Sequence, residues 1–167
     1  NLAENWLEGS LLLNLDSEDR GEVYIGCAGG ADVVVDAQLP CTALQADERL
    51  LSLSLTGLKG GHSGMDIHQP LGNANRLLVR VLWALEEYDA RLVSYQGGTL
   101  RNAIPREAFA QVALPADDME AALATVERLA ATLKAELGSG DSGLVLTAER
   151  AEQADAEPLT LDASAML

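Results

Sequence analysis

The apolar residues between Leu50 and Thr147 follow spacings that restrict this chain to very few folds. Residues 51–55 alternate leucine with serine, and this period of two predicts a half-buried β-strand. From Ala74 to Tyr88 the apolar residues recur instead at helical spacing, and Asn73 suits the N-cap of that helix. The region therefore begins with a strand that is followed by an amphipathic helix.

The rest of the region continues the alternation. Residues 91–95 and 108–114 are predicted strands, and a final short strand covers residues 144–147. Before that final strand, apolar residues at helical spacing predict a second helix, which follows Pro115 and ends at Gly138. The order β-α-β-β-α-β predicts an α+β fold with a four-stranded antiparallel sheet and two helices on one face, as in ferredoxin-like domains.

The remaining segments are predicted to lie outside this domain, which we assign to residues 47–150. Residues 1–46 form a separate element, in which residues 22–26 and 32–36 are predicted short strands. From Ala148 onward Glu, Gln, Asp and Ala dominate, which predicts loop or frayed helix. Residues 151–167 are accordingly expected to be a polar tail, disordered in part.

Composition excludes several classes of function. The formal net charge is −15, which argues against binding to nucleic acid because an acidic surface repels phosphate. The chain has no run of about 18 apolar residues that could cross a membrane, and these 167 residues contain no pattern typical of a secretory signal. The two cysteines, Cys27 and Cys41, lack a C-x-x-C spacing and suggest reduced thiols in a cytoplasmic protein.

Both histidines of the chain, His62 and His68, lie in one glycine-rich stretch with the sequence LKGGHSGMDIH, residues 58–68. A zinc site needs three or four ligands, and only Asp66 stands nearby as another donor. The phosphate-loop pattern is absent. Two interpretations remain: a polar turn, or a flexible backbone that brings His62 to a substrate, where it could donate a hydrogen bond to an oxyanion.

Two further stretches contain candidate site residues. Asp16 follows an apolar run, where it could ligate a metal ion or simply begin a turn. Residues 97–105 read GGTLRNAIP, in which Arg101 and Asn102 follow a Gly-Gly bend. This stretch could be an ordinary loop, or its Arg fork and amide could bind a carboxylate. The residues alone leave both questions open.

Four segments together resemble the bacterial aminoacyl-histidine dipeptidases, which belong to the larger family of di-zinc aminopeptidases, carboxypeptidases and acylases. These segments are DSEDRGEVYIGCAGG (16–30), LKGGHSG (58–64), GNANRLLVR (72–80) and GGTLRNAIPREAFA (97–110). The resemblance implies an α/β catalytic domain with a lid or dimerisation domain inserted into it. Residues 1–46 would then include edge strands of the catalytic domain, and residues 47–150 would be the lid.

The resemblance also implies roles for individual residues. Asp16 would be a zinc ligand, His62 would stabilise the oxyanion, and Asn102 and Arg101 would bind substrate. The implied reaction is hydrolysis of Xaa-His dipeptides by a metal-bridged hydroxide, with two zinc ions in the full-length cytoplasmic enzyme. The implied partners are the dipeptide, the remainder of the catalytic domain and a second copy in a homodimer.

The chain also departs from the family pattern. The family's His-x-Asp pair, bridging Asp, Glu-Glu pair and C-terminal His ligand have no counterpart in this sequence. One carboxylate ligand holds a metal weakly, so we expect the isolated chain to bind zinc weakly or not at all and to be inactive. The alternative function is a non-catalytic dimerisation or small-molecule-binding module, because a βαββαβ fold serves many functions.

Overall fold

A computed structural model describes residues 9–11, 13, 20–26, 29, 31–152 and 156–166. The chain divides into two units, residues 1–36 and residues 37–167. The described residues of the first unit form neither helix nor strand, so the predicted strands at 22–26 and 32–36 are wrong. A strand forms only where a neighbouring strand pairs with its backbone N–H and C=O groups, and the described residues of this unit are not assigned to any strand.

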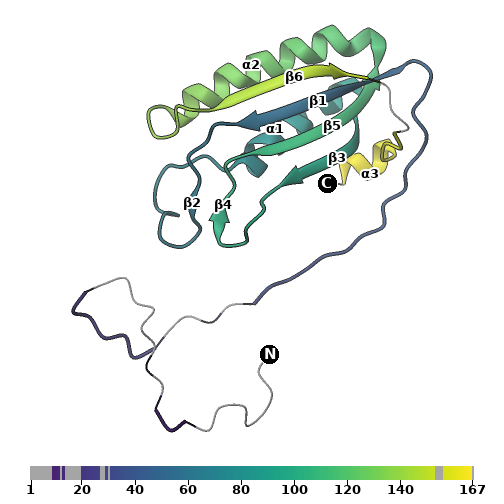
Figure 1. The fold of residues 1–167 in the computed structure, drawn as a ribbon. Coiled ribbons are helices and arrows are strands. Elements are labelled where there is room, and N and C mark those ends of the chain that lie inside the picture. The colour runs from purple at the N-terminus through teal and green to yellow at the C-terminus, as the bar shows by residue number, and fades with distance from the viewer. Residues whose placement is uncertain are drawn as a thin grey trace. The chain divides into compact units, whose positions relative to one another are not determined.

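The second unit contains all the regular elements that the structure describes, and Figure 1 labels its helices and strands. Two short 3₁₀ turns, Glu86–Tyr88 and Ala116–Asp118, adjoin the main helices. The strands and helices in chain order are β1 (Glu48–Thr56), β2 (Gly61–His62), α1 (Ala74–Leu85), β3 (Arg91–Gly97), β4 (Ala103–Ile104), β5 (Ala108–Pro115), α2 (Met119–Leu137), β6 (Val145–Ala151) and α3 (Leu161–Ala165).

Four of these strands form the main sheet in the order β3-β5-β1-β6, and every neighbouring pair is antiparallel. Helices α1 and α2 lie on the same face of this sheet (Figure 1). The predicted α+β fold, with a four-stranded antiparallel sheet and two helices on one face, is therefore confirmed. Strands β2 and β4 form a separate two-stranded ribbon.

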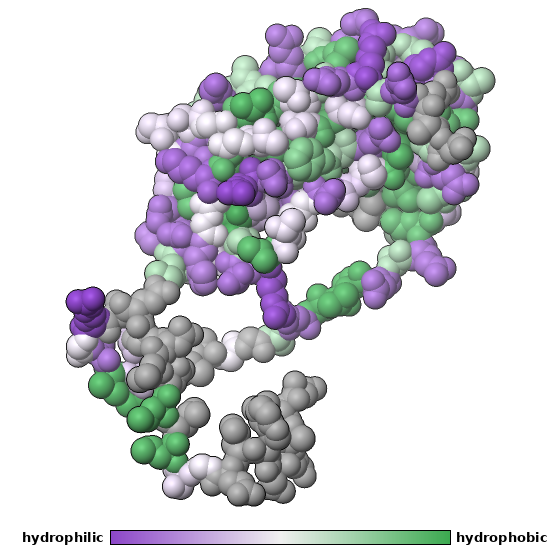
Figure 2. Space-filling model, in the orientation of Figure 1, coloured by the Kyte–Doolittle hydropathy of each residue, from purple (hydrophilic) through white to green (hydrophobic). Residues whose placement is uncertain are grey.

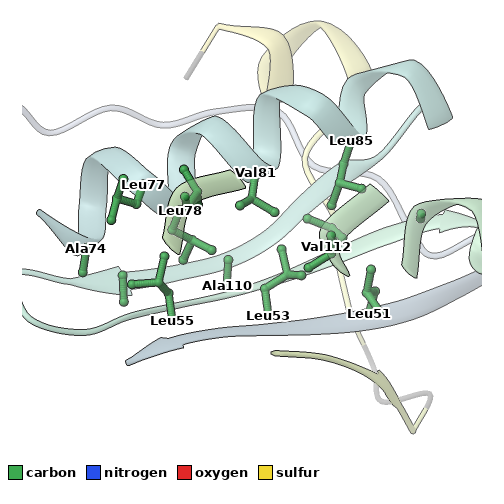
Figure 3. Packing of buried hydrophobic residues seen from close by; sticks show 14 of the residues in the cluster. Leu51, Leu53, Leu55, Ala74, Leu77, Leu78, Val81, Leu85, Ala110 and Val112 are labelled. Carbon is green, nitrogen blue, oxygen red and sulfur yellow. The ribbon is translucent and has the colours of Figure 1, made fainter. Parts of the chain in front are cut away.

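The core lies between the sheet and the two helices (Figure 3). Leu51, Leu53 and Leu55 of β1 point into it and are at most 2% exposed. Burying a leucine side chain fully stabilises a fold by roughly 1.5–3 kcal/mol, so this alternating stripe fixes which face of β1 the helices cover. The helices contribute Leu78, Val81 and Leu85 from α1, and Val126 and Leu133 from α2.

The helix ends follow local rules. The Asn73 side chain accepts a hydrogen bond from the Arg76 N–H at 3.2 Å, so Asn73 is the N-cap of α1 as predicted. Helix α2 ends at Gly138, whose φ of 56° lies in the left-handed region that favours glycine.

The end of the chain differs from the sequence prediction. Strand β6 continues beyond Ala148 to Ala151, because residues 148–151 pair with residues 50–53 of β1. Residues 156–166 include α3 and a bridge between Leu159 and Cys41, whose thiol is free and exposed. The prediction of loop or frayed helix is therefore wrong for residues 148–151, because pairing with a strand far away in sequence outweighs local composition.

A buried ion pair joins two strands of the sheet, and its arginine also contacts this last segment. Arg91 of β3 and Glu48 of β1 are 2.6 Å apart, and their side chains are 4% and 7% exposed. Arg91 also donates to the Thr42 hydroxyl and to the Leu159 carbonyl. Burial pushes the pKa of the Glu48 carboxyl upward, but hydrogen bonds from Arg91 and the Gln45 N–H outweigh burial, so this pKa lies below its ordinary value.

The surface of residues 37–167 is largely hydrophilic on the face shown in Figure 2, with smaller hydrophobic patches. This fits the formal charge of −15. No helix within the described residues is both long enough and apolar enough to cross a membrane.

Candidate functional site

The β2–β4 ribbon brings two of the predicted site residues to adjacent segments. In this ribbon His62 lies opposite Ala103, and Gly61 lies opposite Ile104. The Ser63 N–H donates to the Asn102 carbonyl at 2.9 Å and extends the pairing by one residue. His62 and Asn102 thus flank the same short ladder although they are far apart in the sequence, and Arg101 precedes Asn102 in an exposed turn.

Asp66 closes the loop that carries His62. Its Oδ2 accepts from the His62 N–H at 2.8 Å, and its own N–H donates to the His62 carbonyl at 3.0 Å. Its Oδ1 accepts from the Gln69 side chain at 2.7 Å. Both carboxylate oxygens are therefore used inside the loop. Asp66 acts as a turn-stabilising side chain, and this geometry does not present it as a metal ligand.

The same loop determines which nitrogen of His62 carries its proton. Nδ1 accepts hydrogen bonds from the backbone N–H groups of Gly64 and Met65, each at 3.1 Å. An N–H group only donates, so Nδ1 must act as an acceptor, and the proton of the neutral ring lies on Nε2. The side chain is exposed, so Nε2–H can serve as a donor to a ligand.

Gly64 lies against the His62 ring. A Cβ atom placed on Gly64 would lie 3.4 Å from both Nδ1 and Cε1 of the His62 ring. A Cβ atom there would therefore just touch the imidazole, whereas glycine leaves open space beside the ring and its two backbone donors.

The Gly-Gly bend before Arg101 is also determined by close packing. A Cβ atom on Gly97 would lie 2.1 Å from the Asn75 Oδ1 atom, and that oxygen accepts from the Tyr95 hydroxyl at 3.1 Å. Gly98 has a φ of 73°, which favours glycine. Helix α1 and the end of β3 therefore fix the start of the loop that leads to Arg101 and Asn102.

A cleft of about 370 Å³ adjoins the ribbon. Residues 60–61 and 96–100 line part of it, and its charged lining residues are Lys59, Arg106 and Glu107. The predicted residues His62, Arg101 and Asn102 do not line this cleft but are neighbours of residues that do. A cleft of this size could hold a small molecule beside the exposed His62.

The predicted metal ligand, Asp16, lies outside the described residues. Within the described part of the chain, no group of three or more His, Cys, Asp or Glu side chains could hold a metal ion. The described residues therefore do not by themselves fit the di-zinc centre that the sequence resemblance implies.

One residue that shapes this site was missed by the sequence interpretation. Asp141 follows the end of α2 and is fully buried, and its two oxygens accept from the N–H groups of Lys59 and Gly72. These two residues are the ends of the loop that contains His62. In the sequence Asp141 stands in the glycine- and serine-rich segment GSGDSG, where a solvated turn residue is the ordinary interpretation.

The fold and this sequence match a known class of domain. Residues 53–141, more than half of the chain, match the family described as "Peptidase dimerisation domain", so the chain belongs to that family. This match agrees with the confirmed fold, and it shows that the lid or dimerisation domain implied by the sequence resemblance is present.

Two similar proteins narrow the class. The chain is 49% identical over 146 residues, 87% of its length, to the cytosol non-specific dipeptidase of Escherichia coli (strain K12). The crystal structure of aminoacylhistidine dipeptidase from Vibrio alginolyticus matches 95% of the chain with a TM-score of 0.74 and 42% identity. The resemblance to the dipeptidases is thereby confirmed. The chain spans 30% of the first protein and 32% of the second.

Proposed function

We propose that this chain is the lid domain of a zinc-dependent dipeptidase that hydrolyses Xaa-His dipeptides in the cytoplasm. The family match and the similarity to two dipeptidases support the class of enzyme. One similar protein is named a cytosol non-specific dipeptidase and the other an aminoacylhistidine dipeptidase. The proposed preference for C-terminal histidine follows the second name. The zinc ions would be held by residues other than those described.

The observation that carries the proposal is the tautomer of His62. The two backbone donors on Nδ1 leave the proton on Nε2, so the ring offers one fixed hydrogen-bond donor. When a peptide carbonyl is attacked, its oxygen gains negative charge, and a donor that is already oriented stabilises this oxygen without reorganisation. His62 would act in this way, while the ribbon and Asp66 hold its backbone.

Asn102 and Arg101 would orient the substrate. Asn102 is tied to the His62 loop through the Ser63 N–H, so the two side chains start from adjacent backbone. The Arg101 guanidinium is exposed and has the fork geometry that suits the carboxylate of a dipeptide. The arrangement would hold a dipeptide so that its scissile carbonyl lies near His62 Nε2.

The partners would be the remainder of the catalytic domain and a second copy of the chain. The family is described as a dimerisation domain, and α1 carries an exposed apolar face. Trp83 and Val79 on that helix are 72% and 44% exposed. They border an apolar groove of about 630 Å³ whose lining also includes Leu82, Leu92, Tyr95 and Ala165.

The test is the substitution His62→Ala in the full-length parent enzyme. We expect kcat on an Xaa-His dipeptide to fall by about 10²–10³-fold, the usual effect of removing one oxyanion donor. Bound metal, measured by elemental analysis, should not change. His68→Ala is the matched control, because His68 lies in the same exposed loop and should leave kcat unchanged.

An unchanged kcat in the His62→Ala enzyme would contradict the proposal. It would favour the alternative function, a dimerisation or small-molecule-binding module in which the glycine-rich loop is only a polar turn. A parallel loss of metal would also contradict it, because His62 would then act as a ligand.

A further inference from the structure

Asp141 is a buried carboxylate with two backbone partners. The residue is 0% exposed. Its Oδ1 atom accepts from the Lys59 N–H at 2.9 Å, and its Oδ2 atom accepts from the Gly72 N–H at 2.8 Å. A buried carboxylate is costly unless it is hydrogen-bonded, so these two contacts explain how the side chain is accommodated.

The two contacts lie at the two ends of the His62 loop. Lys59 comes just before β2, and Gly72 comes just before the N-cap of α1. The Lys59 ammonium also donates to the Gly140 carbonyl, next to Asp141. One side chain from the α2–β6 connection thus joins both ends of the segment that carries His62.

Gly72 fits tightly at this point. A Cβ atom on Gly72 would lie 2.8 Å from the Leu58 Cδ2 atom and 3.2 Å from the Asp141 Oδ2 atom. Only glycine lets the backbone approach the carboxylate this closely without displacing Leu58, which is itself buried. The sequence therefore supplies both the acceptor and the residue that can reach it.

A chain of hydrogen bonds connects this closure to His62. The Leu71 N–H donates to the Gln69 carbonyl at 2.8 Å, and the Gln69 side chain donates to Asp66 at 2.7 Å. Asp66 in turn accepts from the His62 N–H at 2.8 Å. Direct hydrogen bonds therefore link Leu71, the neighbour of Gly72, to His62 through Gln69 and Asp66.

We propose that Asp141 is a positioning residue for His62: it closes the base of the loop, fixes where β2 begins and where the loop ends, and thereby places the Nε2–H donor. This inference rests on the proposed function of His62. Asp141 itself touches neither substrate nor reacting atoms. Its effect on turnover would pass entirely through His62.

The experiment is a double-mutant cycle in the full-length enzyme with Asp141→Asn and His62→Ala. Asparagine keeps the shape, but its NH₂ group would face one of the two N–H donors. We expect Asp141→Asn to lower kcat by about tenfold or more, because misplacing a catalytic group by about 1 Å can cost 10²-fold. In the His62→Ala enzyme the same change should alter kcat by less than about twofold.

Two controls separate positioning from loss of folding or charge. Glu127→Gln removes an exposed carboxylate from α2 and should leave kcat unchanged. If Asp141→Asn does not fold, Asp141→Ser, which retains an acceptor oxygen, is measured in the same cycle. A purely structural role for Asp141 would lower the kcat of both backgrounds by the same factor.

The inference is overturned if Asp141→Asn leaves kcat unchanged, or if its effect is equal in the enzyme that retains His62 and in the His62→Ala enzyme. Hydrogen exchange of the Gly72 amide provides an independent reading of the loop. If the Gly72 amide loses protection in the Asp141→Asn enzyme while the His62→Ala enzyme has a normal kcat, loop closure by Asp141 would be supported but the proposed function of His62 would be refuted. Unchanged protection of that amide would refute loop closure itself.

Discussion

Removing Arg91 should destabilise residues 37–167 more than removing any exposed charge. The Arg91→Met variant keeps the apolar part of the side chain but deletes the guanidinium, which donates to Glu48 through Nε at 2.8 Å and through Nη2 at 2.6 Å. Glu48 would then retain only the Gln45 N–H as a partner while still buried. Breaking a buried pair in this way costs about 3–5 kcal/mol.

The assay is urea unfolding of the chain at pH 7, followed by circular dichroism, with the free energy of unfolding obtained by extrapolation. Arg80→Met is the matched control, because Arg80 makes a similar two-pronged contact with Glu136 on the surface. The side chains of that pair are 44% and 48% exposed, far more than those of Arg91 and Glu48. The control should lose much less stability than Arg91→Met.

The double variant Arg91→Met, Glu48→Leu tests whether the lost stability comes from leaving the Glu48 carboxylate buried without Arg91. It removes both buried charges, so it should recover a large part of the stability that the single variant loses. If the double variant is less stable than Arg91→Met, or if Arg91→Met costs under about 1 kcal/mol, the buried-pair account is refuted.

Three further predictions concern pH, dimerisation and zinc. Burial raises the pKa of the Glu48 carboxyl, but the contacts with Arg91 and Gln45 outweigh burial, so this pKa lies below its ordinary value. The ionised Glu48 carboxylate therefore contributes its full stabilisation above the ordinary pKa of 4.5. That stability should be lost as pH falls through the folded-state pKa, and the Arg91→Met variant should show a weaker pH dependence in urea unfolding between about pH 5 and 3. Trp83→Glu should weaken a full-length homodimer by about 2 kcal/mol or more in sedimentation analysis, whereas Glu127→Gln should not. The purified 167-residue chain with added zinc should not cleave an Xaa-His dipeptide, and measurable cleavage would show that the chain holds a complete site.

The main elements could be predicted from the sequence because each depends on spacing within a short segment. The alternation in residues 51–55 and the helical stripe from Ala74 led to the correct strand and helix, and the order of elements led to the correct sheet. Asn73 and Gly138 act within one turn of their helices, so their roles were also visible.

The errors concern pairing between distant segments. Residues 22–26 have the composition of a strand but are not assigned to one, whereas residues 148–151 look polar yet pair with β1. Strand formation depends on a neighbour that a local pattern does not reveal. The same limit hid the contact of Arg91 with Glu48, because each residue alone resembles a surface charge.

The site could be predicted only in outline. His62 and Asn102 were selected by their glycine-rich loops, and the structure places those loops side by side, while their roles stay predictions. The tautomer of His62 depends on two backbone donors, and the closure of its loop depends on Asp141. Neither the tautomer nor the loop closure can be predicted from residue spacing, because both depend on contacts between residues in the folded chain.

The central claim is that His62 donates to the oxyanion of the transition state. The most direct measurement compares a phosphinic dipeptide analogue, whose tetrahedral phosphorus carries an oxygen where the oxyanion would form, with a slow substrate in full-length enzyme. The His62→Ala change should raise the Kd of the analogue by about 10²-fold or more while changing substrate binding little. Equal changes for both ligands, or none for the analogue, would contradict the account.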